Sequence, residues 1–113
     1  MLYQLIVYVP SQDAESLKNA LFDAGAGNYS GYDRCSWETT GIGQFRPLIG
    51  SHPTLGKHNE LEHVEEIKIE TVCEKSVLKK VLRALREHHP YEEPAYGVIE
   101  LKTFEDFEEM PNG

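Results

Sequence analysis

Residues 65–89 read EEIKIETVCEKSVLKKVLRALREHH and contain two elements in direct succession. In the first part apolar and charged residues alternate, which is the period of a strand with one solvated face. From residue 75 onward the apolar residues recur every three or four positions with Lys and Arg between them, as in an amphipathic helix. The alternating set is Ile67, Ile69, Thr71 and Cys73 against Glu66, Lys68 and Glu70. The pattern therefore predicts a strand over 65–73 and a helix over 75–89.

A similar strand and helix come first in the chain. LYQLIVYV (2–9) is a nearly continuous apolar run that ends at a proline, which is typical of a central strand. Ser11 is a capping-type residue, apolar residues follow at helical spacing over 14–24, and Gly25 offers a left-handed stop. These signals predict a first helix between Ser11 and Gly25.

Further strands are expected between and after the two helices. Gly41 and Gly43 bracket a break between CSWETT (35–40) and QFRPLIG (44–50), which predicts a hairpin with a tight turn at the glycines. AYGVIELK (95–102) is the last predicted strand. Residues 1–103 then form one domain and 104–113 an acidic C-terminal tail.

This order of elements predicts the fold class. Two strand–helix units with right-handed crossovers place the first strand and the 65–73 strand side by side in the centre of an antiparallel sheet. Both helices then cover one face. We expect an α+β, ferredoxin-like (βαββαβ) fold with an extra hairpin, whose exposed edges favour self-association.

Composition limits the possible partners. The 113 residues fit one domain, and the net charge of −8 argues against nucleic acid and anionic membranes, which both require clustered Lys and Arg. The start, MLYQLIVYVPSQDAE, has neither a charged n-region nor an apolar stretch long enough for a leader or a span, so we expect a cytoplasmic protein. Cys35 and Cys73 lack CxxC spacing, and each is expected to be a buried small hydrophobe.

The stretch HHPYEEPAYGVIEL (88–101) concentrates the candidate functional groups. Pro90 must end the helix near His88, and Pro94 constrains the chain again, so a stiff connection is the first interpretation. There the helix dipole would favour protonated histidines. The alternative is a divalent-metal site built from His88, His89 and Glu92, with help from Glu93 or from histidines of the 52–63 region, although adjacent residues point apart.

The aromatic residues before residue 40 allow two interpretations. Tyr29, Tyr32 and Trp37 either line a pocket, or the alternation of Cys35, Trp37 and Thr39 turns the tryptophan into the core.

Five segments together resemble one known family: DAGAG, YDRCSW, GIGQFRPLIGSHPTLG, VEEIKIETVC and HPYEEPAY. Over residues 1 to about 102 the chain is similar to short, stand-alone relatives of the NGG-one-interacting-factor-three (NIF-three-like) proteins. Their longer members are often named GTP cyclohydrolase 1 type 2 homologues. The resemblance implies a CutA-like or PII-like domain that assembles into a homo-oligomer, with a trimer as one form. The two-metal site of the longer proteins belongs to the halves that flank this segment, so the resemblance carries over no catalytic residue.

Two functional hypotheses follow. The first is a non-enzymatic regulatory domain that self-associates and binds a small ligand or a protein, without a cofactor, in a cleft between the GIG segment and HPYEEP. The second is a metal-binding protein or a metal-dependent hydrolase that uses the histidines. The candidate ligand-binding residues are Cys35, Gly41, Gly43, His89, Tyr91, Glu92 and Glu93.

Overall fold

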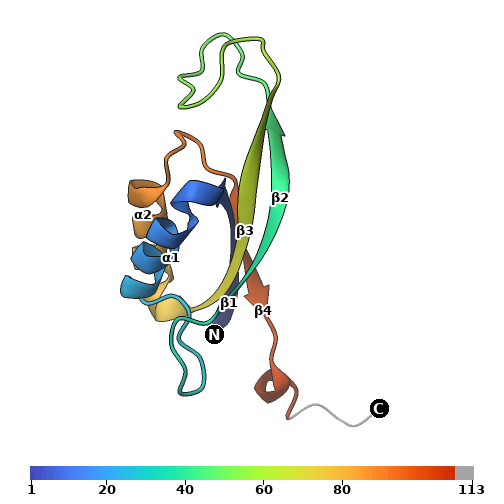
Figure 1. Ribbon diagram of the computed structural model, residues 1–113. Helices are drawn as coiled ribbons and strands as arrows, with labels where there is room; N and C mark the ends of the chain where they lie inside the picture. Colours follow the sequence, from blue (N-terminus) through green and yellow to red (C-terminus); the bar gives the residue numbers. More distant parts are fainter. Residues whose placement is uncertain (109–113) are drawn as a thin grey trace.

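The computed structural model describes residues 1–108, which form a single sheet layer and a single helix layer (Figure 1). The strands are β1 (Leu2–Pro10), β2 (Ser36–Phe45), β3 (Glu62–Glu74) and β4 (Tyr96–Leu101). The helices are α1 (Ala14–Asp23) and α2 (Lys75–His88), with the short 3-10 helices η1 (Ser11–Asp13) and η2 (Phe104–Phe107). Helix η2 lies in the predicted acidic tail, of which residues 109–113 lie outside the described part.

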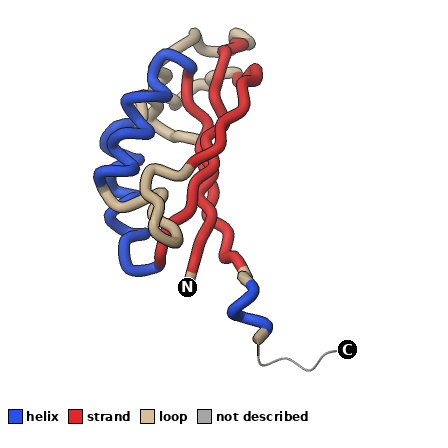
Figure 2. The backbone as a smooth tube through the Cα atoms, turned by 60° about the horizontal axis from the view of Figure 1, so that its bottom comes forward, coloured by secondary structure: helices blue, strands red, loops and turns tan. Residues whose placement is uncertain are grey.

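The sheet has the strand order β2-β3-β1-β4, and every neighbouring pair is antiparallel. The first strand and the 65–73 strand are therefore central, as predicted. Both helices cover the same face (Figure 2). The ferredoxin-like α+β class is confirmed.

The core lies between the sheet and the two helices. Odd-numbered residues of β1 and β3 face the helices, because Leu5 pairs with Thr71 and Val7 pairs with Ile69. The two central strands and the two helices all contribute fully buried side chains. These are Leu5, Val7 and Val9 of β1, Ile69 and Cys73 of β3, Leu17 and Leu21 of α1, and Val81 and Leu85 of α2. Burial of aliphatic side chains on this scale is the main stabilising contribution to the fold.

The predicted extra hairpin, with its tight turn at Gly41 and Gly43, is wrong, because Ser36–Phe45 form one strand of the four-stranded sheet. Strand β2 runs without interruption through both glycines, and its partner is β3, with Gly41 opposite Glu66 and Gly43 opposite Val64. The chain reverses instead through the long loop 46–61. Strand β1 ends at Pro10, opposite Glu66, whereas β2 and β3 stay paired as far as Phe45 and Glu62. We call the part of this pair beyond β1, residues 42–45 and 62–65, the β2–β3 extension.

The helix ends agree with the sequence more closely than the helix starts. Gly25 adopts φ +115° after α1, its N–H donates to Phe22 O at 3.0 Å, and the N–H of Ala26 donates to Leu21 O at 3.0 Å. This is the Schellman arrangement that a glycine stop predicts. The predicted cap at Ser11 is wrong, because this residue begins η1 and its hydroxyl donates to Glu65 Oε1 at 2.9 Å.

The second face of the sheet carries no helix. Trp37 lies opposite Glu70 and so shares this face; its side chain is 69% exposed, which rules out a core position. Exposed Tyr8 and Ile99 lie on the same face. We call this surface, marked by Tyr8, Trp37 and Ile99, the open face. None of the helices in the described part of the chain is long and apolar enough to cross a membrane.

Candidate functional site

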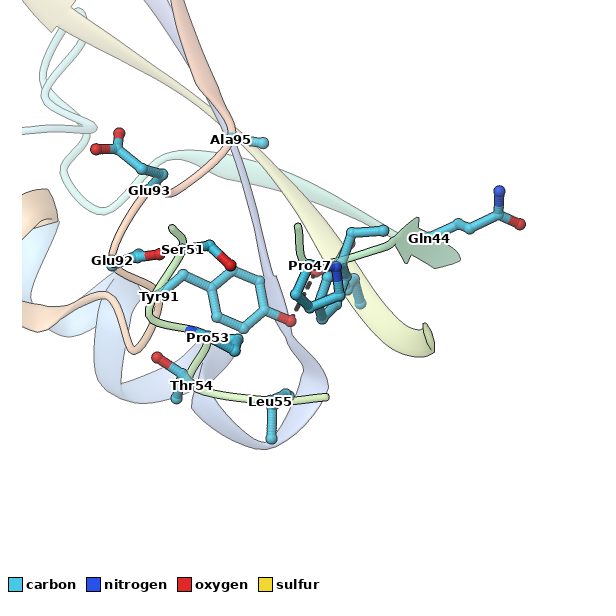
Figure 3. Close-up of a pocket in the computed structure, with 12 residues that line it drawn as sticks. Gln44, Pro47, Ser51, Pro53, Thr54, Leu55, Tyr91, Glu92, Glu93 and Ala95 are labelled. Carbon is cyan, nitrogen blue, oxygen red and sulfur yellow. Dashed lines mark hydrogen bonds between the residues drawn. The ribbon is translucent and has the colours of Figure 1, made fainter. Parts of the chain in front are cut away.

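A pocket forms at the end of the sheet where β1 stops. Loop 46–61 lies above the connection from α2 to β4 (Figure 1), and a cavity of about 260 Å³ lies between them. Figure 3 shows the Tyr91 ring at the centre of the lining side chains. We call this cavity the Tyr91 pocket; it is lined by Gln44, Phe45, Pro47, Ser51, Pro53, Thr54, Leu55, Glu66, Tyr91, Glu92, Glu93 and Ala95.

Tyr91 is held by two rings and a carboxylate. Its ring centroid lies 6.1 Å from that of Phe45 and 5.1 Å from that of His89, both in tilted arrangements. Such tilted contacts are favourable because the edge of one ring meets the face of the other. The Tyr91 hydroxyl donates to Glu66 Oε2 at 3.2 Å. Burial, assisted by the Glu66 carboxylate, raises the pKa of Tyr91 to about 12, so the hydroxyl remains a donor at neutral pH.

His89 stands behind Tyr91 and is buried, with 7% of its surface exposed. Its Nε2 donates to the carbonyl oxygen of Tyr8 at 2.7 Å, and its Nδ1 accepts the N–H of Tyr91 at 3.1 Å. These partners assign the neutral tautomer with the proton on Nε2. Burial lowers the pKa of His89, and it outweighs the opposing effects of Tyr8 O, Glu66 and Asp13. The expected protonation of this histidine by the helix dipole is therefore wrong.

Two hydrogen bonds fasten loop 46–61 to the connection before β4. The backbone N–H of His52 donates to Glu92 Oε1 at 2.8 Å, and the hydroxyl of Thr54 donates to the carbonyl oxygen of Pro90 at 2.8 Å. Glu92 and Glu93 are both exposed, and the Glu93 carboxylate points away from the Tyr91 ring (Figure 3). Glu92 thus positions the loop, and the prolines at 90 and 94 stiffen the segment that the loop contacts.

The predicted ligand-binding residues separate into three groups. Tyr91, Glu92 and Glu93 line the Tyr91 pocket, and His89 supports it from behind. Gly41 and Gly43 line a neighbouring hollow on the open face, which Glu66 also borders. Cys35 lies apart from both cavities, at the opposite end of β2, where its carbonyl oxygen accepts the Thr71 hydroxyl at 2.7 Å.

The metal candidates do not converge. The Nδ1 of His88 lies 3.0 Å from the carbonyl oxygen of Ala84 in its own helix, whereas both ring nitrogens of His89 are engaged with backbone groups. Over residues 1–108, no three His, Cys, Asp or Glu side chains are grouped so that they could hold a metal ion.

Sequence reasoning missed the far wall of the pocket. Glu66 had the pattern of an ordinary solvated position in an alternating strand, and no local signal marks it. Loop 46–61 does carry a local signal: RPLIGSHPTLG (46–56) contains prolines and leucines, which favour a packed loop over a fully solvated one.

Comparisons with known proteins identify the family. No family model matches the chain. The Bacillus subtilis protein named GTP cyclohydrolase 1 type 2 homolog is 46% identical over 101 residues, which cover 89% of this chain and 27% of that relative. The crystal structure of a Bacillus cereus protein related to NIF3 matches with a TM-score of 0.78 and 39% identity, over 90% of this chain and 26% of that chain.

Two more distant structures share the fold alone. CutA from Archaeoglobus fulgidus matches with a TM-score of 0.66 at 15% identity, covering 91% of this chain and 86% of that chain. GlnK from Bacillus subtilis matches with a TM-score of 0.59 at 16% identity, covering 88% of this chain and 81% of that chain. The CutA-like and PII-like character predicted from the sequence is confirmed at the level of the fold.

The chain spans about a quarter (27%) of the length of the curated relatives that it matches. The match includes 89% of this chain at 46% identity. The chain therefore belongs, through this one CutA-like segment, to the NIF3-related family of GTP cyclohydrolase 1 type 2 homologues.

Proposed function

We propose that this domain is a non-catalytic ligand-binding module that self-associates through its open face. The observation that carries the proposal is the Tyr91 pocket, a preformed cavity with mostly apolar walls and a few polar groups, which is the usual make-up of a small-molecule site. Its volume of about 260 Å³ is near the lower end for such sites, so the ligand is small or inserts only one group.

The chemistry of the pocket favours binding over catalysis. His89 is not available as a general base, because both of its ring nitrogens are occupied by backbone partners. The raised pKa of Tyr91 keeps its hydroxyl protonated. The thiol of Cys73 is buried in the core, where burial raises its pKa to about 11 and keeps it unreactive.

Nucleoside triphosphates do not suit this pocket. The relatives are named after GTP cyclohydrolase, and the GlnK structure is a complex with ATP. A triphosphate needs Lys, Arg or a metal ion to balance its charge. The residues that line the Tyr91 pocket include three glutamates and neither Lys nor Arg.

Self-association is supported by the composition of the open face. Trp37 is 69% exposed and Ile99 is 49% exposed, on a sheet surface that no helix covers. Exposed apolar surface of this kind marks interaction sites, and homo-oligomers commonly bury it between copies.

Mapping of ligand contacts by NMR tests the binding function. We expect members of a mixed fragment library to shift the amide signals of Phe45, Thr54 and Tyr91 together and saturably. The Tyr91→Ala variant should lose these shifts, whereas Tyr32→Ala, an exposed tyrosine in a separate loop, should keep them. Shifts that scatter over the surface, or that survive in Tyr91→Ala, would count against the pocket as the binding site.

A further inference from the structure

We propose that the Tyr91 pocket selects an organic cation, an ammonium or guanidinium group carried on a short apolar body. This inference rests on the proposed binding function and specifies its ligand class. Every ionisable lining residue that is charged at neutral pH is a glutamate: Glu66, Glu92 and Glu93. The chain as a whole carries a net charge of −8, which attracts cations at longer range.

The carboxylate of Glu66 lacks a cation within the described structure. It is half-buried and accepts one hydrogen bond from the neutral Tyr91 hydroxyl, and among residues 1–108 it takes part in no ion pair. Lys68, two positions further along β3 on the same face, has its Nζ 2.9 Å from Glu70 Oε1. A partly desolvated carboxylate is stabilised when a cation joins it, so Glu66 favours a positively charged ligand.

The aromatic rings beside Glu66 complete the site for a cation. Phe45 and Tyr91 line the pocket together with Glu66, and their ring centroids lie 6.1 Å apart with an interplanar angle of 57°. A cation within about 6 Å of a ring centroid is attracted by the negative face of the ring. Rings combined with an acid recognise alkylammonium groups in this way.

The remaining walls accommodate the apolar body of the ligand. Pro47, Pro53 and Leu55 from loop 46–61 border the cavity with Ala95 from the start of the β4 segment. Pro47 is buried and Pro53 is half-buried, so these walls are held in place by the fold. An alkyl or aryl group of a few carbons can lie against them while its charged end meets Glu66.

Three probes of similar size and different charge test the ligand class: benzylamine, benzyl alcohol and benzoate, each titrated at pH 7 with NMR detection. We expect benzylamine to bind at least about tenfold more tightly than benzyl alcohol, as one charge-assisted hydrogen bond allows, and benzoate to bind most weakly. The comparison uses the unaltered chain, so it does not depend on whether a variant folds.

Two substitutions test whether the preference for benzylamine depends on the Glu66 carboxylate. Glu66→Gln keeps the side chain's size and should reduce the preference for benzylamine over benzyl alcohol to about twofold or less, because the charge is removed. Glu87→Gln, at an exposed position of α2 outside the pocket lining, should leave the preference unchanged. If Glu66→Gln does not fold, Glu66→Asp serves instead: it keeps the charge but draws the carboxylate back by one methylene, so the affinity for benzylamine should fall while that for benzyl alcohol should not.

The outcomes separate the two proposals. Equal binding of benzylamine and benzyl alcohol, or a preference that survives in Glu66→Gln, would overturn the ligand class and leave the pocket intact as a binding site. No pocket shifts with any of the three probes would overturn both proposals. Nα-acetyl-lysine amide in the same titration distinguishes the sources: binding points to a lysine side chain of a protein, and binding of benzylamine alone points to a free amine.

Discussion

Two residues of the connection before β4, His89 and Tyr91, are held uncharged at neutral pH by their surroundings. Burial lowers the pKa of His89 and raises that of Tyr91, because in each case the charged form loses hydration. The N–H of Tyr91 donates to His89 Nδ1, so the backbone of one residue fixes the tautomer of the other. The backbone of Tyr91 is therefore tied to the neutral form of His89.

The stability of the domain should fall as the pH decreases below the ordinary histidine pKa of 6.5. Since the pKa of His89 is lower in the folded state, the unfolded chain takes up a proton first, and stability is lost as the pH falls through the folded pKa. Urea melts at pH 7.5 and 5.5 measure the difference. His89→Gln should flatten this dependence, and His88→Gln, at the exposed neighbour, should retain it. An unchanged slope in His89→Gln would contradict the assignment.

Truncation of Tyr91 should be costly. Tyr91→Ala removes the contacts with Phe45 and His89, and we expect a loss of about 2 to 4 kcal/mol in the free energy of unfolding. Tyr91→Phe removes only the hydrogen bond to Glu66 and should cost about 0.5 to 1.5 kcal/mol.

Glu93→Gln is the matched control for these tyrosine variants, because Glu93 is exposed; it should stay within about 0.5 kcal/mol of the unaltered chain. Denaturant melts of all three variants measure these changes in the free energy of unfolding. A neutral Tyr91→Ala beside a severely destabilising Glu93→Gln would reverse the structural interpretation of this stretch.

At the scale of elements, the β2–β3 extension connects the sheet to the pocket. Beyond Pro10 the strand β3 has no β1 neighbour, and the Glu66 side chain lies against the backbone of Gly43 on the adjacent strand. A glycine at 43 leaves the space that the Glu66 carboxylate occupies. Gly41, two residues earlier on the same face, has no atom within 4 Å of the position that a Cβ would take.

The two glycines of β2 should therefore differ in their response to alanine. In Gly43→Ala the new Cβ meets the Glu66 carboxylate, which must swing away from Tyr91, and we expect an altered Tyr91 ring signal in NMR and a loss of about 1 kcal/mol. Gly41→Ala should leave the ring signal unchanged and stay within about 0.5 kcal/mol of the unaltered chain. Identical spectra for the two variants would show that Glu66 does not depend on Gly43.

At the scale of the whole molecule, the single sheet has one covered and one uncovered side. The helices bury the apolar odd-numbered residues of β1 and β3, whereas Tyr8, Trp37 and Ile99 remain exposed on the open face. A second copy of the chain can bury these residues without any change in the fold.

Sedimentation at micromolar concentration should give a mass that is a multiple of one chain. Trp37→Glu places a charge on the open face and should shift the mass toward that of one chain, because an unpaired buried charge is costly. Ile49→Glu, at an exposed position in loop 46–61, should not shift it. A mass equal to one chain for the unaltered protein would exclude self-association under these conditions.

The sequence by itself determined the order and kind of the elements. Alternation over 65–73, helical spacing over 75–89 and the stops at Gly25 and Pro90 are local signals, because each depends on backbone conformation within a few residues. With the right-handed crossover rule, they were sufficient to predict the ferredoxin-like sheet with β1 and β3 in its centre. The stiff turn at HPYEEP was predictable for the same reason.

Tertiary structure alone decided which face of each strand is covered and which residues come into contact at the Tyr91 pocket. Alternation shows that Trp37 and Thr39 share a face, but only the position of the helices exposes that face. The break at Gly41 and Gly43 suggested a turn, yet pairing with β3 keeps these glycines extended. Glu66 meets Tyr91 across 25 residues of sequence, and His52 meets Glu92 across 40. Such contacts depend on how the elements pack, and the local periodicity of the sequence carries no information about them.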